Sequence, residues 1–527
     1  MNKPKLRKAV FFPAFTAVLA SGIIGLANNE LLISWFKAAF NWAYVHLSWL
    51  YQLIVVTLFI LCCVLMVSKA GGIRIGGEHA KPRHGFWTWF AMSLTGGIGA
   101  SIVSSSIAQP VVFLESIWGE LEGYQIVPGS TEAVLFAMGR SLHEWTFFPY
   151  AFYGIFAVSI AYVCFNKGKS VSLSSTLEPL IGQRASRPGI AAAIDAIAVL
   201  ALALAIVGTL GTFIGLATTC FKNVYSIAPT PTLMFFIMVL TTVLYLCSSL
   251  SGVERGIRFF SRLNFWFYMF LLAVILLLSD SVIFSLDTVT SSIGYWLQHL
   301  PSWAFDTGME GGAALIQEWT VYNWAFWMAF APVTGVFLAQ LSYGHTIRES
   351  LFVNWIMPSL FAILWFGVFG GCAMNWQLNG IVDLAAVIRQ GGTYAGIWAL
   401  LQNIPCGGIL IPITLFIMLI SFATSADNSI TVISALCIRG RRIGDEAPHI
   451  VKITWGLVIG LLSFLLMAYA SGSKGNDGVR YMVITIGSLL SVYIVLHIAS
   501  SVKMFFIDPH HTGASSAKPE ESASRTN

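Results

Sequence analysis

The sequence predicts an all-α polytopic membrane protein with twelve transmembrane helices. Of its 527 residues, 57% are hydrophobic and only 10% are charged, whereas soluble domains carry about 25% charged residues. Crossing a hydrocarbon core takes about 20 apolar residues of helix. Runs of that kind lie at 10–27, 48–68, 87–117, 146–165, 189–220, 231–250, 261–284, 320–342, 351–373, 408–437, 451–470 and 479–505.

Positive charges indicate how these spans are oriented. If the N-terminus is inside, 23 of the 29 Lys and Arg residues fall in the inner segments. Lys and Arg are retained on the cytoplasmic side of membrane proteins. We therefore expect both the N-terminus and the C-terminus to be cytoplasmic.

Signatures of soluble enzymes are incomplete in this chain. Gly168-Lys169-Ser170 resembles the end of a phosphate loop, but Val163 stands where the first glycine belongs. His143-Glu144 has Phe147 where a zinc protease needs its second His. The eight cysteines lie in or beside apolar runs without metal-ligand spacing. We expect no catalytic residue, no enzymatic cofactor and no nucleic-acid partner.

Three spans contain residues that a simple membrane anchor would avoid. The third holds a Gly-rich and Ser-rich stretch from Thr95 to Ser106, and the fifth holds a similar run from Gly208 to Gly215. The tenth holds Asp427 within Phe422–Ser429. Such stretches are typical of broken helices that line a cavity, although close packing between helices is an alternative. An acid inside a span usually faces a cavity or a partner.

Two of the expected outer segments are long. Residues 118–145 are acidic and polar. Residues 285–318 contain five large apolar side chains at helical spacing, which predict a short amphipathic helix lying along the membrane interface: Tyr295, Trp296, Leu297, Leu300 and Trp303.

The eighth span begins with an aromatic stripe. Helical spacing places its members on one face: Trp319, Asn323, Trp327, Phe330 and Thr334. An aromatic residue at the end of a span usually marks the headgroup level, which suits Trp319. Trp327 and Phe330 lie deeper, so they form either core packing or a cage for a cation.

The same region resembles the betaine/choline/carnitine transporters. The family pattern W-T-x-F-Y-W-x-W-W, P-F-V-G-x-F and R-G-R-T-I-R-E matches W-T-V-Y-N-W-A-F-W, P-V-T-G-V-F and Y-G-H-T-I-R-E between Trp319 and Glu349. Further matches lie at Ser174–Gly182, Ser251–Ile257 and Thr424–Asp427. They extend from about residue 10 to 505.

This resemblance implies two inverted five-helix repeats, a LeuT-like fold, preceded by two extra helices. It divides the chain into 1–85 with the peripheral helices, 86–284 as the first repeat, 285–318 as a periplasmic segment, 319–506 as the second repeat and 507–527 as a disordered cytoplasmic tail. It also implies a bacterial inner-membrane protein, surrounded by the lipid bilayer, that assembles as a homotrimer through the amphipathic helix at 289–303.

The resemblance further implies transport of a small quaternary ammonium compound such as glycine betaine, carnitine or choline, held in an aromatic box. The matching positions are Trp145, Tyr150, Tyr153, Phe326, Trp327 and Phe330, with Gly97, Gly99 and Ser101 from the third span. In the fourth-span pattern H-W-x-x-x-P-W-x-x-Y, Glu144 takes the place of His. In the third-span pattern W-G-x-x-E-P, Gln109 takes the place of the acid. Choline-selective members tend to have Asp at the position of Ser101, so Ser101 favours a zwitterion.

Coupling to Na⁺ is implied in the same way. The third-span backbone and two tenth-span hydroxyls would bind one ion, through Thr95, Ile98, Thr424 and Ser425. Thr209 and Thr212 of the fifth span are candidates for a second ion. Sodium-independent exchangers of the family have an Arg where this chain has Asn264, although Arg262 is close by. Exchange without sodium is therefore the alternative to symport, and a ligand sensor that does not transport is an alternative of another class.

Overall fold

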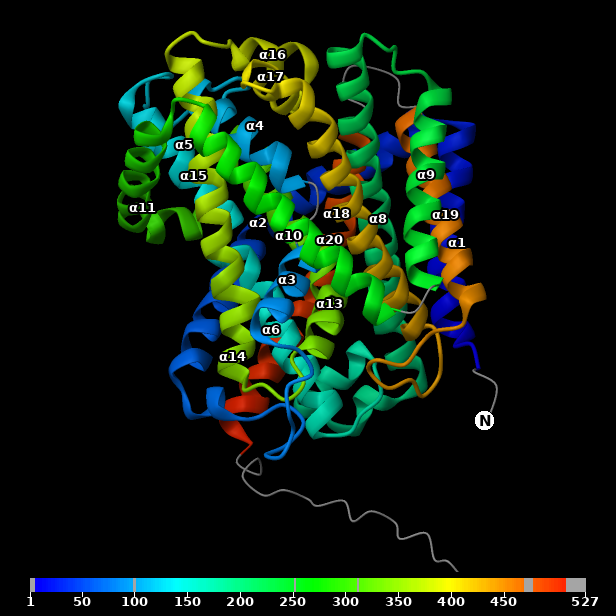
Figure 1. Ribbon diagram of the computed structural model, residues 1–527. Helices are drawn as coiled ribbons and strands as arrows, with labels where there is room; N and C mark the ends of the chain where they lie inside the picture. Colours follow the sequence, from blue (N-terminus) through cyan, green and yellow to red (C-terminus); the bar gives the residue numbers. More distant parts are fainter. Residues whose placement is uncertain (1–4, 98–100, 251–252, 310–311, 469–476, 509–527) are drawn as a thin grey trace, which may run out of the picture.

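The protein forms a long bundle of helices (Figure 1). The computed structural model describes residues 5–97, 101–250, 253–309, 312–468 and 477–508. Within these ranges it contains helices and two isolated β-bridges, Leu6 with Ile438 and Arg74 with Thr346, and no β-strand. The predicted all-α fold is confirmed.

The first half of the chain supplies ten α-helices. They are α1 (Lys8–Ala27), α2 (Asn29–Val67), α3 (Phe86–Gly97), α4 (Ser101–Glu115), α5 (Thr131–Trp145), α6 (Phe147–Ala161), α7 (Glu178–Ile181), α8 (Pro188–Tyr225), α9 (Pro231–Leu250) and α10 (Val253–Leu278). Four short turns of 3-10 or π helix lie between them: η1 (Lys69–Gly72), η2 (Tyr162–Asn166), η3 (Leu173–Leu177) and η4 (Gly182–Ser186).

The second half supplies the remaining described helices. They are α11 (Val282–Phe305), α12 (Ala313–Leu315), α13 (Tyr322–Leu341), α14 (Ile347–Leu351), α15 (Met357–Leu378), α16 (Leu384–Gly391), α17 (Thr393–Asn403), α18 (Gly407–Leu436), α19 (His449–Ala468) and α20 (Asp477–Val502). The turns η5 (Ile316–Val321), η6 (Phe352–Ile356) and η7 (Lys503–Ile507) join α13, α15 and α20.

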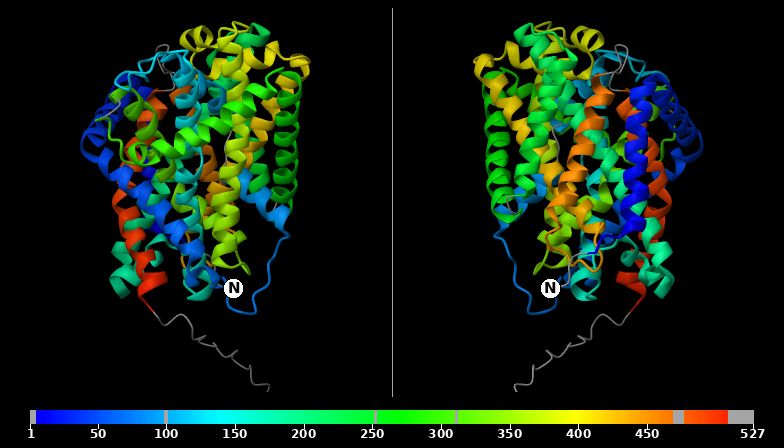
Figure 2. Two further views of the ribbon diagram at one scale, coloured as in Figure 1. Left: turned by 90° about the vertical axis from the view of Figure 1, so that its left-hand side faces the viewer. Right: turned by 90° about the vertical axis from the view of Figure 1, so that its right-hand side faces the viewer.

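Eleven helical segments of the described chain are long and apolar enough to cross a membrane. They correspond to eleven of the twelve predicted spans. The remaining span, 87–117, consists of α3 and α4 on either side of residues 98–100, which lie outside the described part. The start of α1 and the end of η7 lie at the same end of the bundle (Figure 1, Figure 2), as an even number of crossings requires.

The structure differs from two expected boundaries. Residues 131–145, expected within an outer segment, form the largely buried helix α5, and α6 follows directly after it in one helical segment from Thr131 to Asn166. The amphipathic helix is longer than 289–303: α11 spans Val282–Phe305 and packs one face against α5 and α15.

Helix α13 lies at the centre of the packing, against α6 on one side and α20 on the other. Gly335 of α13 lies so close to α6 that a Cβ there would stand 2.5 Å from the Cβ of Phe156. Gly487 of α20 lies against the backbone of Ala325 in the same way. Small residues let helix backbones approach closely in membrane proteins, so these glycines fix α13 between its neighbours.

A buried ion pair connects α5 with the end of α11. The Nη2 atom of Arg140 lies 2.9 Å from Oδ2 of Asp306, and both side chains are fully buried. Tyr124 donates to the same oxygen at 2.8 Å. The guanidinium also lies over the ring of Trp303, 4.5 Å from its centroid. Because a charge removed from water needs a partner, Asp306 neutralises Arg140 here.

Candidate functional site

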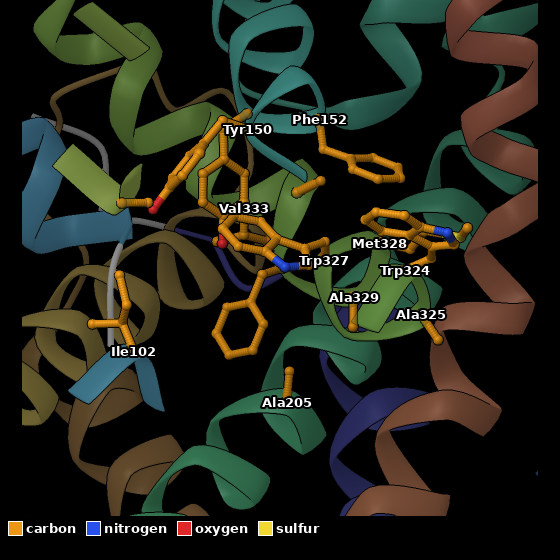
Figure 3. Close-up of a cluster of buried hydrophobic side chains, with 14 of the residues drawn as sticks. Ile102, Tyr150, Phe152, Ala205, Trp324, Ala325, Trp327, Met328, Ala329 and Val333 are labelled. Atoms are coloured by element: carbon orange, nitrogen blue, oxygen red, sulfur yellow. The ribbon is translucent and has the colours of Figure 1, made fainter. Parts of the chain in front are cut away.

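Three of the predicted box residues form a closed aromatic cluster. The ring centroid of Trp327 on α13 lies 5.0 Å from that of Tyr150 and 4.7 Å from that of Tyr153, both on α6. Figure 3 shows Tyr150 lying against Trp327. None of the three side chains is more than 3% exposed. The close packing of α6 against α13 therefore brings these rings together.

The other three predicted rings are those of Trp145, Phe326 and Phe330. Trp145 is partly buried, and its ring lies 6.4 Å from that of Trp327. Phe326 and Phe330 pair with each other at 4.9 Å, one turn apart on α13. Phe330 is buried, whereas Phe326 is partly exposed.

A cavity of about 90 Å³ is lined by two further predicted box residues, Trp145 and Phe326, and the Trp145 ring lies 6.4 Å from that of Trp327 in the cluster. Its walls are rich in hydroxyl, amide and aromatic groups. They come from α4, α5, α8, η5, α13 and α17: Ser101, Ser104, Ser105, Ala108, Gln109, Trp145, Thr212, Trp319, Tyr322, Asn323, Phe326, Thr393 and Tyr394. Ser101 and Thr212, predicted for substrate and for a second ion, thus face the same space.

A polar network connects three residues of the cavity wall, Gln109, Trp145 and Asn323, with the buried Glu144. Gln109 donates from Nε2 to Glu144 at 2.6 Å, and Thr320 donates to the other Glu144 oxygen at 2.7 Å. The Trp145 indole donates to Gln109 Oε1 at 2.8 Å. Asn323 donates to the main-chain oxygen of Glu144 and accepts from the Trp327 indole at 3.2 Å. Hydrogen bonds therefore connect Trp145 to Glu144 through Gln109, and Trp327 to Glu144 through Asn323.

The predicted sodium residues lie on helices that pack against each other, α3 and α18. Thr95 and Thr424 are buried, and their hydroxyls donate to main-chain oxygens one turn earlier, of Ala91 and Ile420, at 2.8 Å each. Ser425 is half-buried. Gly97 ends α3, while Ile98 and Gly99 lie outside the described residues.

The two hydroxyls predicted for a second ion have different surroundings. Thr209 is buried and donates to the main-chain oxygen of Ala205 at 3.0 Å, whereas Thr212 reaches the cavity. Asn264, at the position of the exchangers' Arg, is fully buried and donates to Ser421 of α18 at 2.6 Å. Arg262 is exposed and donates instead to Thr88 near the start of α3, at 2.6 Å.

Trp319 lines the cavity and is bound by residues of the segment after α4. Its indole donates to Glu120 at 3.2 Å, and its ring stacks on Trp118 at 6.3 Å. Burial raises the pKa of the Glu120 carboxyl above its ordinary value, although hydrogen bonds from Trp118 and Trp319 act in the opposite direction. Trp319 is thus held by its own partners, away from Tyr150 and Tyr153.

Sequence reasoning missed part of the wall. Thr393 and Tyr394 belong to α17, which packs against α4, α8 and α18. At 11 residues α17 is too short for a span, so periodicity alone gave no reason to place it in the site. Gln109 and Glu144 were noticed only as departures from family patterns.

A family model for betaine/carnitine/choline transporters matches residues 9–510. The chain belongs to the BCCT family. Its members in the comparison include the glycine betaine transporter OpuD of Bacillus subtilis (strain 168), which is 29% identical over 93% of this chain and 93% of its own length.

Two other BCCT relatives have different substrates in their names. The ectoine/hydroxyectoine transporter of Virgibacillus pantothenticus is 26% identical over 96% of this chain and 97% of its own length. The osmo-dependent choline transporter BetT2 of Acinetobacter baylyi (strain ATCC 33305 / BD413 / ADP1) is 25% identical over 98% of this chain and 73% of its own length. This BCCT protein is therefore a multi-pass membrane transporter and not an enzyme.

Proposed function

We propose that this BCCT protein transports a small onium compound with a trimethylammonium head, such as glycine betaine, carnitine or choline, by alternating access. The observation that carries the proposal is the cluster of Tyr150, Tyr153 and Trp327 beside the cavity. Electron-rich ring faces attract quaternary ammonium groups, with Trp the strongest. Relatives across nearly the whole chain are named for glycine betaine and choline.

The six aromatic residues of the box are proposed to act at different stages of the cycle. Trp145 and Phe326 line the cavity now, while Trp327 is buried and packed against Tyr150 and Tyr153. A substrate entering the cavity would contact Trp145 and Phe326 first. Movement of the Tyr150 and Tyr153 side chains, with α6 and α13 staying packed together, would then expose the Trp327 ring to the substrate.

Sodium symport is the coupling that we propose. Oxygen ligands suit a hard cation, and the buried hydroxyl of Thr424 lies on α18, which packs against α3. Sodium-independent exchange would need a cationic side chain at the position of Asn264. Arg262 is exposed and engaged by Thr88, and Asn264 is neutral, so the contacts favour sodium.

The experiment is uptake of radiolabelled glycine betaine, carnitine and choline by purified protein in liposomes, with an inward Na⁺ gradient or with K⁺ in its place. We expect uptake of at least one compound, and faster uptake with Na⁺. Substrate-driven counterflow without Na⁺ would instead indicate exchange. Binding without counterflow would indicate a sensor, and no response to any onium compound would refute the proposal.

We also propose the wider arrangement that the family implies. The protein would lie in the bacterial inner membrane as a homotrimer, with cytoplasmic termini and two inverted repeats at 86–284 and 319–506. The surface of α11 supports the trimer, since Leu297 and Phe305 are more than half exposed on a helix whose other face is packed.

A further inference from the structure

Glu144 is an acid buried beside the cavity. Its side chain lies near the end of α5 and is 1% exposed. Gln109 and Thr320 bind its two oxygens, and both partners are neutral. Among the ion pairs of the described residues none includes Glu144. A buried acid usually pairs with a cation or serves a function.

The nearby basic side chain on the same helix does not balance this acid. Arg140 lies one turn before Glu144 on α5, but its guanidinium is paired with Asp306 at 2.9 Å and bonded to Tyr124 at 2.7 Å. Arg140 and Asp306 together contribute no net charge. An ionised Glu144 would therefore leave this part of the protein with one unbalanced negative charge.

The negative charge of an ionised Glu144 would act on a ligand in the cavity. Gln109 lines the cavity and donates to the Glu144 carboxylate. Asn323 lines it too and donates to the main-chain oxygen of Glu144, and Trp145 follows Glu144 in the chain. One layer of neutral side chains therefore separates the carboxylate from the space in which a ligand can sit. Charges in a site shielded from water act over such a distance, because the surroundings screen them weakly.

We propose that Glu144 provides the negative charge that balances the cationic head of the substrate, so that the site selects onium compounds with a net positive charge over zwitterions. The inference rests on the proposed function and names its substrate class. The absence of Asp at Ser101 favoured a zwitterion, but the structure places an acid near the same cavity from another helix, α5.

A purely structural role for Glu144 makes a different prediction. As a tether, its side chain would only hold α4, α5 and η5 together through Gln109 and Thr320. Removing it would then impair transport of all substrates equally. A charge that balances the substrate instead changes the ratio between a cation and a zwitterion that share the same head group.

The test measures kcat/KM for choline and for glycine betaine in liposomes. Choline carries the trimethylammonium charge alone, whereas glycine betaine adds a carboxylate. We expect the wild-type protein to prefer choline. The isosteric Glu144→Gln variant should lower the choline-to-betaine ratio by about tenfold or more, the size of effect expected for one weakly screened charge.

Two further variants separate charge from shape. Thr320→Val removes a hydrogen bond to Glu144 but keeps the acid, so the substrate ratio should stay close to that of the wild type. Gln109→Glu combined with Glu144→Gln moves the acid across the 2.6 Å hydrogen bond onto α4. This exchange should restore the choline preference that Glu144→Gln alone loses.

The failures of the two proposals can be told apart. If the wild-type protein transports neither compound nor any other onium solute, the proposed function itself is refuted. If it transports them but prefers glycine betaine, or if Glu144→Gln leaves the ratio unchanged, the role of Glu144 is refuted while transport stands. The wild-type preference decides this even if no variant can be purified.

Discussion

Trp327 contacts Asn323 of its own helix, α13, and Tyr150 and Tyr153 of α6. Asn323 accepts its indole N–H at 3.2 Å, and the rings of Tyr150 and Tyr153 pack against it. Trp319, two turns earlier, is bound instead by Glu120 and Trp118. The two tryptophans of one stripe therefore have separate environments.

Replacing these two residues tests the aromatic box. A desolvated cation over an aromatic ring is stabilised by about 2 kcal/mol, so Trp327→Ala should raise the KM for onium uptake by more than about tenfold. Trp327→Phe keeps a ring and should retain part of the affinity. Trp319→Ala should raise the KM less, and equal effects at both positions would contradict the assignment.

At the scale of elements, the segment before α1 clamps two long helices. The Nη1 atom of Arg7 lies 2.6 Å from Asp195 of α8 and donates to the main-chain oxygen of Leu436 in α18 at 3.0 Å. The main-chain N–H of Arg7 donates to Cys437 at 2.7 Å. Ser172 and the N–H of Leu173 also bind Asp195, at 2.6 and 2.8 Å.

Arg7→Ala should destabilise the protein by about 3 kcal/mol, because removing one partner leaves a buried, unbalanced charge. The measurement is thermal unfolding in detergent. Lys8→Ala is the matched control, since Lys8 is exposed. Adding Asp195→Asn to Arg7→Ala should recover much of the loss; if Arg7→Ala melts like the wild type, the clamp does not contribute to stability.

His345 links α3 to the loop after α13. Its ring stacks on Trp89 with centroids 3.7 Å apart, and its Nδ1 lies 3.6 Å from Glu349. Burial lowers the pKa of His345, with Arg74 and His84 acting in the same direction and Glu349 opposing them. The folded protein therefore takes up this proton less readily than the unfolded chain.

Acid should consequently weaken the folded state through His345. As the pH falls through about 6.5, the ordinary pKa of His, the unfolded chain binds the proton first and stability is lost. The melting temperature of the wild type should drop between pH 7.5 and 5.5 by more than that of His345→Gln, which cannot titrate. Parallel curves for the two proteins would contradict this role.

Long apolar elements were predictable because burial in lipid demands unbroken apolar runs, as in α8 and α18. Helix α5 was expected to be part of an outer segment because the partners of its polar residues lie far away in the sequence: Arg140 pairs with Asp306, and His143 accepts from Trp296 at 3.1 Å. The aromatic positions of the site followed from family patterns. The part of the cavity wall on α17 could not be predicted, because tertiary packing places α17 there and no local sequence pattern indicates it.

At the scale of the whole molecule, α11 provides the test of assembly. Leu297 is 57% exposed on this helix. If α11 forms the trimer contact, Leu297→Glu should place a charge in an apolar interface and shift the protein toward monomers in light scattering. Gln298→Glu, at the neighbouring exposed position, should affect assembly less. A trimer that persists unchanged in Leu297→Glu would exclude this surface.

The expected orientation can be read from cysteine labelling. Cys406 and Cys247 are exposed, and N-in topology puts Cys406 outside and Cys247 near the inner side. A membrane-impermeant maleimide should label intact cells at Cys406. Cys406→Ser should abolish this labelling and Cys247→Ser should not. The reverse pattern would invert the topology.

The two glycine contacts of α13 have a consequence for how the cavity opens. No space remains between α13 and α6 at Gly335, or between α20 and α13 at Gly487. The three helices can therefore move relative to one another only if these contacts break. We therefore expect α6, α13 and α20 to travel as one rigid body. The hinge of the transport cycle would then lie across the cavity, where α4, α8 and α17 face α13 through hydroxyl-bearing side chains.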